Sequence, residues 1–342
     1  MTTVPRVARS IERADHRKRV GSHPDVITGS DDDRDNNRHP AKPKKRRVDS
    51  DLNATESRPG CADSNGSAKA RDNVAGSLLK LCVQSQRWQG LDAVTDLVVF
   101  GDSTTRFGAH KTWLNHFMQF TNTSRSRSGS SAPMTAHVYA TQGHTIEDDL
   151  SSPLDQFFSH FPAKLGPQSS STLGAESTLY VIWMGTNDCG RTEEDDLEEI
   201  VEKLVGDGLD ELYTKAGGRN FLVIDVPPKD RSPGALDNSS ALSPRYTTFN
   251  DLLITHLAQF ASSSSHASVF VFSSYDVVAA ILDDPTVHGF EEEDAERPRE
   301  GEENEESDDE REEDGIWLDE LHLTGPVHKI IADRLRTALA SL

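Results

Sequence analysis

Leu97-Val98-Val99-Phe100-Gly101-Asp102-Ser103 is the stretch of sequence on which the fold depends. The run from Leu97 to Phe100 is continuously apolar, which is typical of a strand buried on both faces of a parallel sheet. Gly101 permits a tight exit from that strand, and Ser103 follows at its carboxyl end. Functional sites of open α/β sheets gather at this edge. The stretch therefore predicts a buried strand that places a serine at a functional edge.

Four more short apolar runs follow along the chain, and stretches with helical spacing lie between them. The runs are Ala136–Ala140, Leu179–Met184, Phe221–Val226 and Val269–Phe272. Apolar residues at helical spacing occupy 113–120, 146–158, 195–216, 246–260, 277–282 and 326–339. This alternation predicts an α/β fold, a doubly wound, five-stranded parallel sheet with helices on both faces.

Composition divides the 342-residue chain into parts of different character. Residues 1–75 contain few large apolar side chains and are predicted to be a disordered, charged tail, so 76–342 form the folded domain. Within that domain, residues 291–314 hold 16 acidic side chains against three arginines. This run is predicted to be a solvated acidic insertion. Because it carries −13 of the net charge of −21, the acidity of the whole chain says nothing about a substrate.

The tail contains a basic cluster, Lys42–Val48, which resembles a monopartite nuclear localisation signal. Such a signal would bind a nuclear import receptor, but a plain solvated basic tract explains the cluster as well. The globular part shows no basic patch, so no obligate nucleic-acid partner is expected. No run approaches the ~18 apolar residues of a membrane span, and no apolar core follows the basic N-terminus as in a secretory signal. The predicted location is intracellular, cytoplasmic or nuclear.

Two further blocks carry the groups that a serine nucleophile needs. The run Tyr180–Met184 ends in Gly185-Thr186-Asn187-Asp188, where the Asn187 amide is suited to bind a developing oxyanion. The segment Asp319-Glu320-Leu321-His322 precedes the last helix. Its three-residue spacing, in a helical turn, would put Asp319 and His322 on one side, with the carboxylate orienting the base.

Each block also has a plainer explanation. Ser103 could cap a helix, and Asn187 with Asp188 could form a turn. Asp319, His322 and His328 could bind a metal ion, but no further ligand cluster supports this. The three cysteines have no metal-ligand spacing. Neither a metal nor a cofactor is therefore predicted.

The order and placement of the three blocks resemble the SGNH (GDSL-type) hydrolase superfamily over about residues 94–342. Val226-Pro227-Pro228-Lys229-Asp230-Arg231-Ser232-Pro233 is similar to the fungal GDSL lipase/acylhydrolase branch, which includes carbohydrate acetyl esterases. The resemblance implies a flavodoxin-like three-layer sandwich and hydrolysis of a carboxylic ester of a lipid, sugar or small molecule. A catalytically silent scaffold that uses the acidic insertion and the basic tail is the alternative.

The resemblance also implies a role for each matched residue. Ser103 would be the nucleophile, His322 the base and Asp319 the group that orients the base. The oxyanion hole would consist of the Ser103 N–H, the Gly143 N–H and the Asn187 amide. Gly143 is matched through Val138–Thr145, where Gln142 and His144 replace small residues common in the family.

Overall fold

The described residues form a central seven-stranded sheet that is covered by helices. The computed structural model describes residues 26–27, 78–106, 110–129, 133–162, 173–298 and 315–342. Its strands lie in the order β1-β4-β3-β5-β6-β7-β2. Five neighbours are parallel: β4 (Thr135–Ala140), β3 (Asp96–Gly101), β5 (Thr178–Trp183), β6 (Asn220–Ile224) and β7 (Ser268–Phe272). The predicted five-stranded parallel sheet of flavodoxin-like order is thereby confirmed.

Two antiparallel strands that the sequence did not predict extend this sheet at its edges. β1 (Val26–Ile27) pairs with β4, and β2 (Leu79–Val83) pairs with β7. β2 alternates half-buried with exposed residues, as an edge strand with one covered face does. β1 falls within the predicted tail; the rest of 1–75, including Lys42–Val48, lies outside the described residues.

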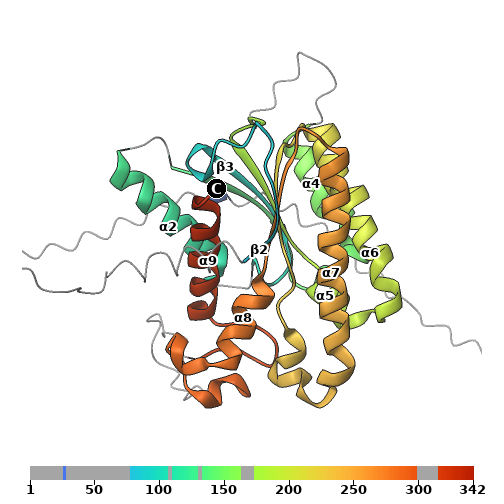
Figure 1. Cartoon of the computed structure of the whole chain (residues 1–342), viewed down its shortest axis with the longest axis vertical. Helices are drawn as coiled ribbons and strands as arrows, with labels where there is room; N and C mark the ends of the chain where they lie inside the picture. The colour runs from blue at the N-terminus through green and yellow to red at the C-terminus, as the bar shows by residue number, and fades with distance from the viewer. Residues whose placement is uncertain (1–25, 28–77, 107–109, 130–132, 163–172, 299–314) are drawn as a thin grey trace, which may run out of the picture.

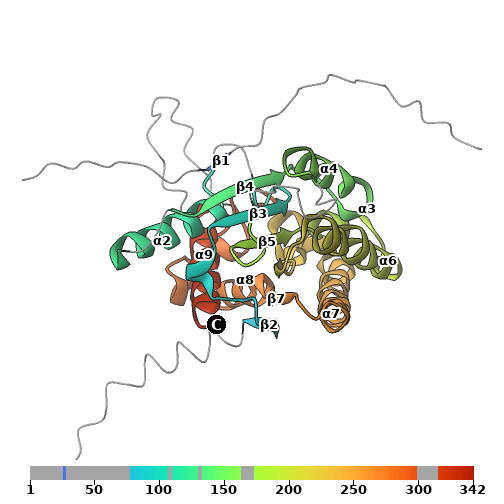
Figure 2. The ribbon, with the colours of Figure 1, turned by 90° about the horizontal axis from the view of Figure 1, so that it is seen from above.

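Helices cover both faces of the sheet (Figures 1 and 2). α2 (Trp113–Ser128), α8 (Ser274–Asp283) and α9 (Gly325–Ala340) pack on one face, where their apolar residues meet Leu97 and Val99 of β3. The other face meets Val98 and Phe100. Its helices are α3 (Ile146–Asp149), α4 (Ser151–His160), α5 (Thr186–Arg191), α6 (Leu197–Lys203) and α7 (Ser239–Ser263). None of the described helices has the length and hydropathy of a membrane-spanning segment.

Three details differ from the predictions. The single helical stretch expected over 195–216 consists of a 3₁₀ turn, α6 and two π-helical segments, Leu204–Leu209 and Leu212–Ala216. α7 begins at Ser239 rather than near Tyr246, and it contains Pro244. Residues 299–314 of the acidic insertion lie outside the described residues, while 291–298 include a short 3₁₀ helix in which Asp294 is buried.

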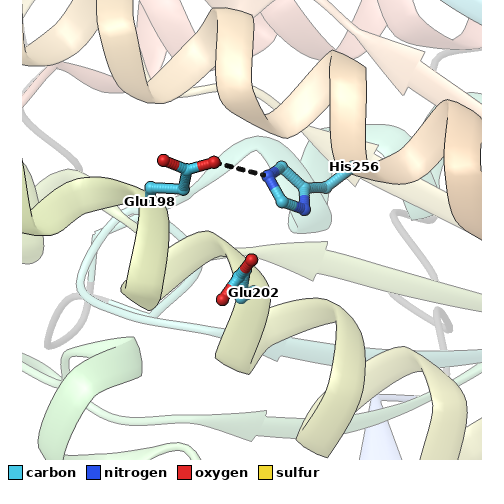
Figure 3. A group of neighbouring side chains, drawn as sticks. All are labelled: Glu198, Glu202 and His256. Carbon is cyan, nitrogen blue, oxygen red and sulfur yellow. Dashed lines mark ion pairs between the residues drawn. The ribbon is translucent and has the colours of Figure 1, made fainter.

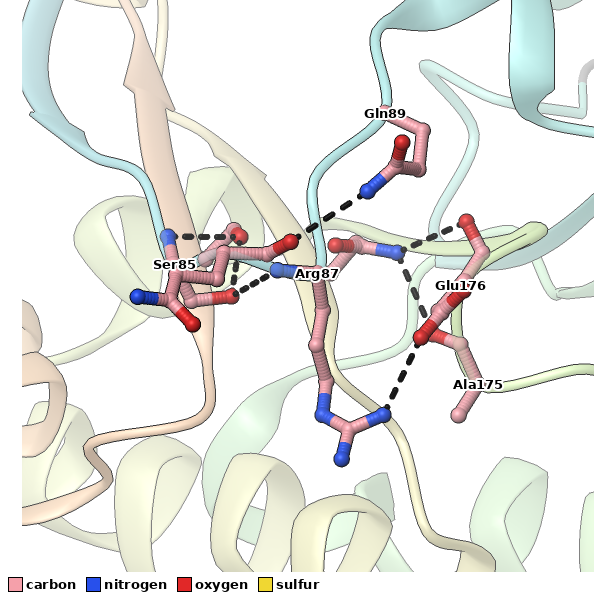
Figure 4. A network of polar contacts seen from close by, with 8 residues as sticks. Ser85, Arg87, Gln89, Ala175 and Glu176 are labelled. Atoms are coloured by element: carbon pink, nitrogen blue, oxygen red, sulfur yellow. Dashed lines mark hydrogen bonds and ion pairs between the residues drawn. The ribbon is translucent and has the colours of Figure 1, made fainter.

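Neutral polar side chains join the loops at the amino-terminal ends of β5, β6 and β7 (Figure 4). The Asn220 side-chain nitrogen lies 3.2–3.4 Å from the carbonyl oxygens of Ala175, Glu176 and Thr178. Ser85 donates its backbone N–H to the Ser268 hydroxyl at 3.1 Å. This end of the sheet is held by hydrogen bonds to backbone groups.

Candidate active site

Ser103 occupies the turn that leaves β3 at the carboxyl end of the sheet. The Asp102 carboxylate shapes this turn by accepting the Thr104 N–H at 2.8 Å. A Cβ atom on Gly101 would lie 2.4 Å from the Thr105 hydroxyl oxygen, so the close turn requires glycine there. Ser103 is half-buried, which leaves its hydroxyl within reach of a substrate.

Asp319 and His322 belong to a tight turn between the acidic insertion and α9. The turn is closed by a bridge between Trp317 and Leu323 and by the Leu318 N–H, which donates to the His322 carbonyl at 2.8 Å. This turn is not helical, so the expected geometry was wrong in that respect. The two side chains nevertheless meet, because Asp319 also accepts the His322 backbone N–H at 2.7 Å.

The three predicted catalytic side chains form one hydrogen-bonded chain. His322 Nε2 lies 3.1 Å from Ser103 Oγ, and His322 Nδ1 lies 2.8 Å from Asp319 Oδ2. Partial burial works to raise the pKa of Asp319, but hydrogen bonds from the backbone N–H groups of His322 and Leu321 and from the imidazole outweigh it. The resulting pKa is below the usual value, so Asp319 is ionised at neutral pH and can orient the imidazole.

Asn187 lies in the first turn of α5, which follows β5 directly at the carboxyl end of the sheet. Gly185 begins this turn with φ +119°, and a Cβ atom there would lie 2.3 Å from the Phe249 ring. The Asn187 Nδ2 atom donates to the His144 carbonyl at 2.9 Å and lies 3.4 Å from the Asp102 carboxylate. The amide is thus held between two segments near the serine.

Gly143 directly precedes His144, whose carbonyl accepts the hydrogen bond from Asn187. Gly143 lies in a turn, where its backbone has φ +77°. Its carbonyl accepts a hydrogen bond from Arg191 at 3.1 Å. The buried Asp188 carboxylate accepts the N–H groups of Ile146 and Glu147, which fixes the start of α3 beside this turn. Gly143 is therefore near Asn187, although the described residues that line the pocket at Ser103 do not include it.

A pocket opens at Ser103 Oγ, and we call it the serine pocket. Its lining includes Ser103, Asn187 and His322. It also includes Lys229, which the sequence did not single out as a site residue, and His328, which the sequence offered only as a possible metal ligand. Burial lowers the pKa of Lys229 to about 7, although the carboxylates of Asp102 and Asp319 act in the opposite direction. Burial also lowers the pKa of His328 to about 3, so that imidazole is neutral at physiological pH. Only the place of Lys229 directly after Pro227-Pro228, at a strand's carboxyl end, could have signalled its position.

A second group of side chains that could share a metal ion lies away from the serine pocket, on α6 and α7 (Figure 3). Ligand atoms of Glu198, Glu202 and His256 all lie within 4.8 Å of one another. His256 on α7 is 3.8 Å from Glu198 on α6, an ion-pair distance, and both glutamates are exposed. The described residues do not bring Asp319, His322 and His328 together in this way.

Known proteins are similar to this chain to different degrees. The chain is 27% identical over 187 residues to an acetylesterase from Thermothelomyces thermophilus, which covers 52% of this chain and 61% of the relative. The chain thus spans less than two thirds of that relative. An acetylxylan esterase from Geobacillus stearothermophilus is 12% identical with a TM-score of 0.44, covering 71% of this chain and 94% of that one. A lipolytic protein of the G-D-S-L family from Veillonella parvula is 13% identical with a TM-score of 0.41, covering 70% and 94%.

The chain is also similar to a whole family of proteins. The family of GDSL-like lipases/acylhydrolases matches residues 97–335, well over half of the chain. The match begins in β3, directly before Ser103, and ends in α9, after His322. The chain belongs to the GDSL-like lipase/acylhydrolase family.

Proposed function

We propose that the protein is a serine hydrolase that cleaves a carboxylic ester of a lipid, sugar or small molecule through an acyl-enzyme. The observation that carries this proposal is the hydrogen-bonded chain from Ser103 through His322 to Asp319, with distances of 3.1 and 2.8 Å. A serine hydroxyl becomes a useful nucleophile when a base lies at such a distance. Family membership and the similarity to an acetylesterase support the same reaction class.

The mechanism follows from the roles that these contacts permit. His322 Nε2 accepts the Ser103 proton as the oxygen attacks the ester carbonyl, and Asp319 stabilises the imidazolium that forms. The imidazolium then protonates the departing alcohol, which leaves an acyl group on Ser103. Water enters, His322 takes its proton, and hydroxide attack releases the acid and restores the serine.

The oxyanion that forms at each attack is bound, in this proposal, by the N–H groups of Ser103 and Gly143 and by the Asn187 amide. The bond from Asn187 to the His144 carbonyl supports the assignment, because it fixes the Gly143 turn against the amide. Donors held in place before the reaction need no reorganisation as charge develops. Neither a metal nor a cofactor enters the proposed steps.

The test compares wild type with Ser103→Ala and His322→Ala on p-nitrophenyl acetate and p-nitrophenyl octanoate. Each variant is expected to lose about 10⁴- to 10⁶-fold in kcat, because the two residues act as a unit. Ser262→Ala serves as the control, because Ser262 is exposed on α7 and its hydroxyl bonds the Gln259 carbonyl. This control should match wild type on both esters.

A fluorophosphonate probe separates the hydrolase from the scaffold. Stoichiometric labelling of wild type that Ser103→Ala abolishes would support the nucleophile independently of the ester chosen. Folded wild type that neither labels nor hydrolyses either ester would refute the proposal and favour the catalytically silent scaffold.

The proposed compartment is intracellular, with a nuclear import receptor as partner of Lys42–Val48. Five of these seven residues are lysine or arginine, which supports electrostatic recognition. A reporter fused to residues 1–75 should accumulate in nuclei and return to the cytosol when the cluster is replaced by alanine. A purely cytosolic fusion would contradict the nuclear part.

A further inference from the structure

Lys229 is an unusual residue for the floor of a hydrolase pocket. Only 4% of its surface is exposed, and buried lysines normally require a compensating partner. Its Nζ donates to the Leu321 carbonyl at 2.6 Å and lies 5.1 Å from the centre of the Trp317 ring. Both contacts reach the turn that carries His322, which places the ammonium next to the catalytic base.

The hydrogen bonds of this ammonium are incompletely used. An ammonium has three N–H donors, and among the described residues one acceptor, the Leu321 carbonyl, is bonded to it. Asp102 and Asp319 act on its charge from nearby. However, neither carboxylate lines the serine pocket, whereas Lys229 does. Lys229 therefore lines the pocket with N–H groups that can donate to a further hydrogen-bond partner.

The rest of the pocket repeats this electrostatic character. Besides Lys229 and His322, its described lining includes Lys111, His110 and the neutral imidazole of His328, and no acidic side chain. His328 is 5% exposed, and its Nδ1 has no hydrogen-bond partner among the residues that the structure describes. The described lining of the serine pocket thus holds two lysines, Lys111 and Lys229, and no carboxylate. A negatively charged group would meet attraction here, where a neutral sugar ester would leave the ammonium without an added partner.

We propose that Lys229 binds an anionic group on the substrate, so that the preferred ester carries a carboxylate or similar charge close to the scissile carbonyl. This inference rests on the proposed ester hydrolysis and names its substrate class. Lys229 forms no covalent bond and transfers no proton in the reaction. Its ammonium holds the anion while Ser103 attacks, and the anion in turn favours the charged form of the lysine.

The experiment uses matched esters that differ in charge. 4-Acetoxybenzoate and its neutral amide, 4-acetoxybenzamide, place the charge on the alcohol side. Mono-4-nitrophenyl adipate and its methyl ester place the charge on the acyl side. For each pair, the ratio of kcat/KM for the charged ester to that for the neutral ester is divided by the ratio of the hydroxide-catalysed rates.

Wild type should prefer the charged member of at least one pair, and Lys229→Met should lower that ratio about 10- to 100-fold, as expected for a hydrogen bond to a charged group. Lys215→Met is the control, because Lys215 is exposed, pairs with Glu211 and is not among the described residues that line the pocket. It should keep the wild-type ratio. Methionine matches lysine in length, so the comparison removes charge with little change in volume.

Two results would overturn the inference. Wild type without a preference in either pair would do so even if Lys229→Met failed to fold. Equal losses on charged and neutral esters in Lys229→Met would show that the lysine only positions the Leu321 carbonyl.

Binding to Ser103→Ala, measured by calorimetry, separates this inference from the proposed reaction. The Ser103→Ala variant should bind 4-acetoxybenzoate more tightly than 4-acetoxybenzamide. The double variant with Ser103→Ala and Lys229→Met should bind the two esters with equal affinity. A difference in binding without turnover by wild type would refute the hydrolase while upholding the anion site.

Discussion

The two ends of the parallel sheet use buried polar groups in opposite ways. We call the ends of β5, β6 and β7 near Asn220 the amino edge, and the ends near Ser103 and Lys229 the carboxyl edge. Both edges bury polar side chains almost completely. The starts of β5, β6 and β7 do so with the neutral side chains Thr178, Asn220 and Ser268. The carboxyl edge buries ionisable groups as well as neutral ones, and a buried arginine, Arg125, bonds the carbonyls that precede β3.

At the amino edge, the Asn220 amide bonds loop carbonyls and Ser85 bonds Ser268 (Figure 4). The charged pair beside them, Arg87 and Glu176, is half exposed, so water screens it and it adds little stability. No proton needs to move for these contacts to persist. This edge holds the sheet together over a wide pH range.

At the carboxyl edge, burial raises the pKa of Asp102 to about 6 and that of Asp225 to about 7, while it lowers that of Lys229 to about 7. Hydrogen bonds from Thr104 and the charge of Lys229 act against the shift of Asp102. Buried ionisable groups cost stability, and perturbed groups of this kind cluster where chemistry occurs. The comparison shows that this fold places buried ionisable groups, which reduce its stability, at the edge where the reaction is proposed.

The largest effect that tests this comparison is expected at Asn187, the asparagine of the carboxyl edge. Asn187→Ala removes the proposed side-chain oxyanion donor and should lower kcat about 10²- to 10³-fold. Loss of its bond to the His144 carbonyl should cost about 1 kcal/mol of unfolding free energy. Ester hydrolysis and urea denaturation of the same preparation measure both quantities. An unchanged kcat would remove Asn187 from the oxyanion hole.

Asn220, the asparagine of the amino edge, should behave in the opposite way. Asn220→Ala leaves loop carbonyls without their buried donor and should lower the unfolding free energy by about 1–3 kcal/mol. The kcat per folded molecule should stay within about twofold of wild type. Substitutions at distant sites that share no partners usually have independent effects, and Asn220 lies at the opposite end of the sheet from Ser103. A stable variant with a damaged kcat would break the comparison between the edges.

The elements that could be predicted are those whose sequence pattern lies within the element itself. β3, β5 and β7 were predicted within one or two residues, because a fully buried strand must be a continuous apolar run. β2 was missed because its five residues alternate and its partner β7 lies far away in sequence. The π-helical segments after α6 share the helical apolar spacing, so periodicity cannot distinguish them from an α-helix.

The site shows the same division. Ser103 and His322 could be named because each follows a recognisable local motif, and the fold brings their side chains to 3.1 Å. Lys229 could not be assigned a role, because a lysine after two prolines is typical of an exposed turn. Its burial is produced by a turn 92 residues later, where it bonds Leu321. Contacts of such sequence separation can be predicted only where a motif marks both partners, as it does for Ser103 and His322.

The smallest expected effect follows from the titration of the carboxyl edge. Lys229 is faced by Asp102 beside Ser103, by Asp319 from the turn and by His328 from α9, and His322 and His116 in turn act on His328. Its folded-state pKa of about 7 means that the ammonium is present below that pH and lost above it. Protonation of Asp102, whose pKa is about 6, adds positive charge in the same direction at lower pH. The preference for anionic esters should therefore fall about tenfold from pH 6 to pH 8.5.

The ratio of rates on charged and neutral esters isolates this titration, because His322 serves as base for both esters and its protonation cancels. Measurements at constant ionic strength keep screening equal across the series. Lys229→Met should give a flat ratio, and Asn220→Ala, which changes only the amino edge, should reproduce the wild-type curve. A wild-type ratio that stays constant to pH 8.5 would mean that the carboxyl edge does not use its buried charge in binding. The two edges would then differ only in how far their buried polar groups lower the free energy of unfolding.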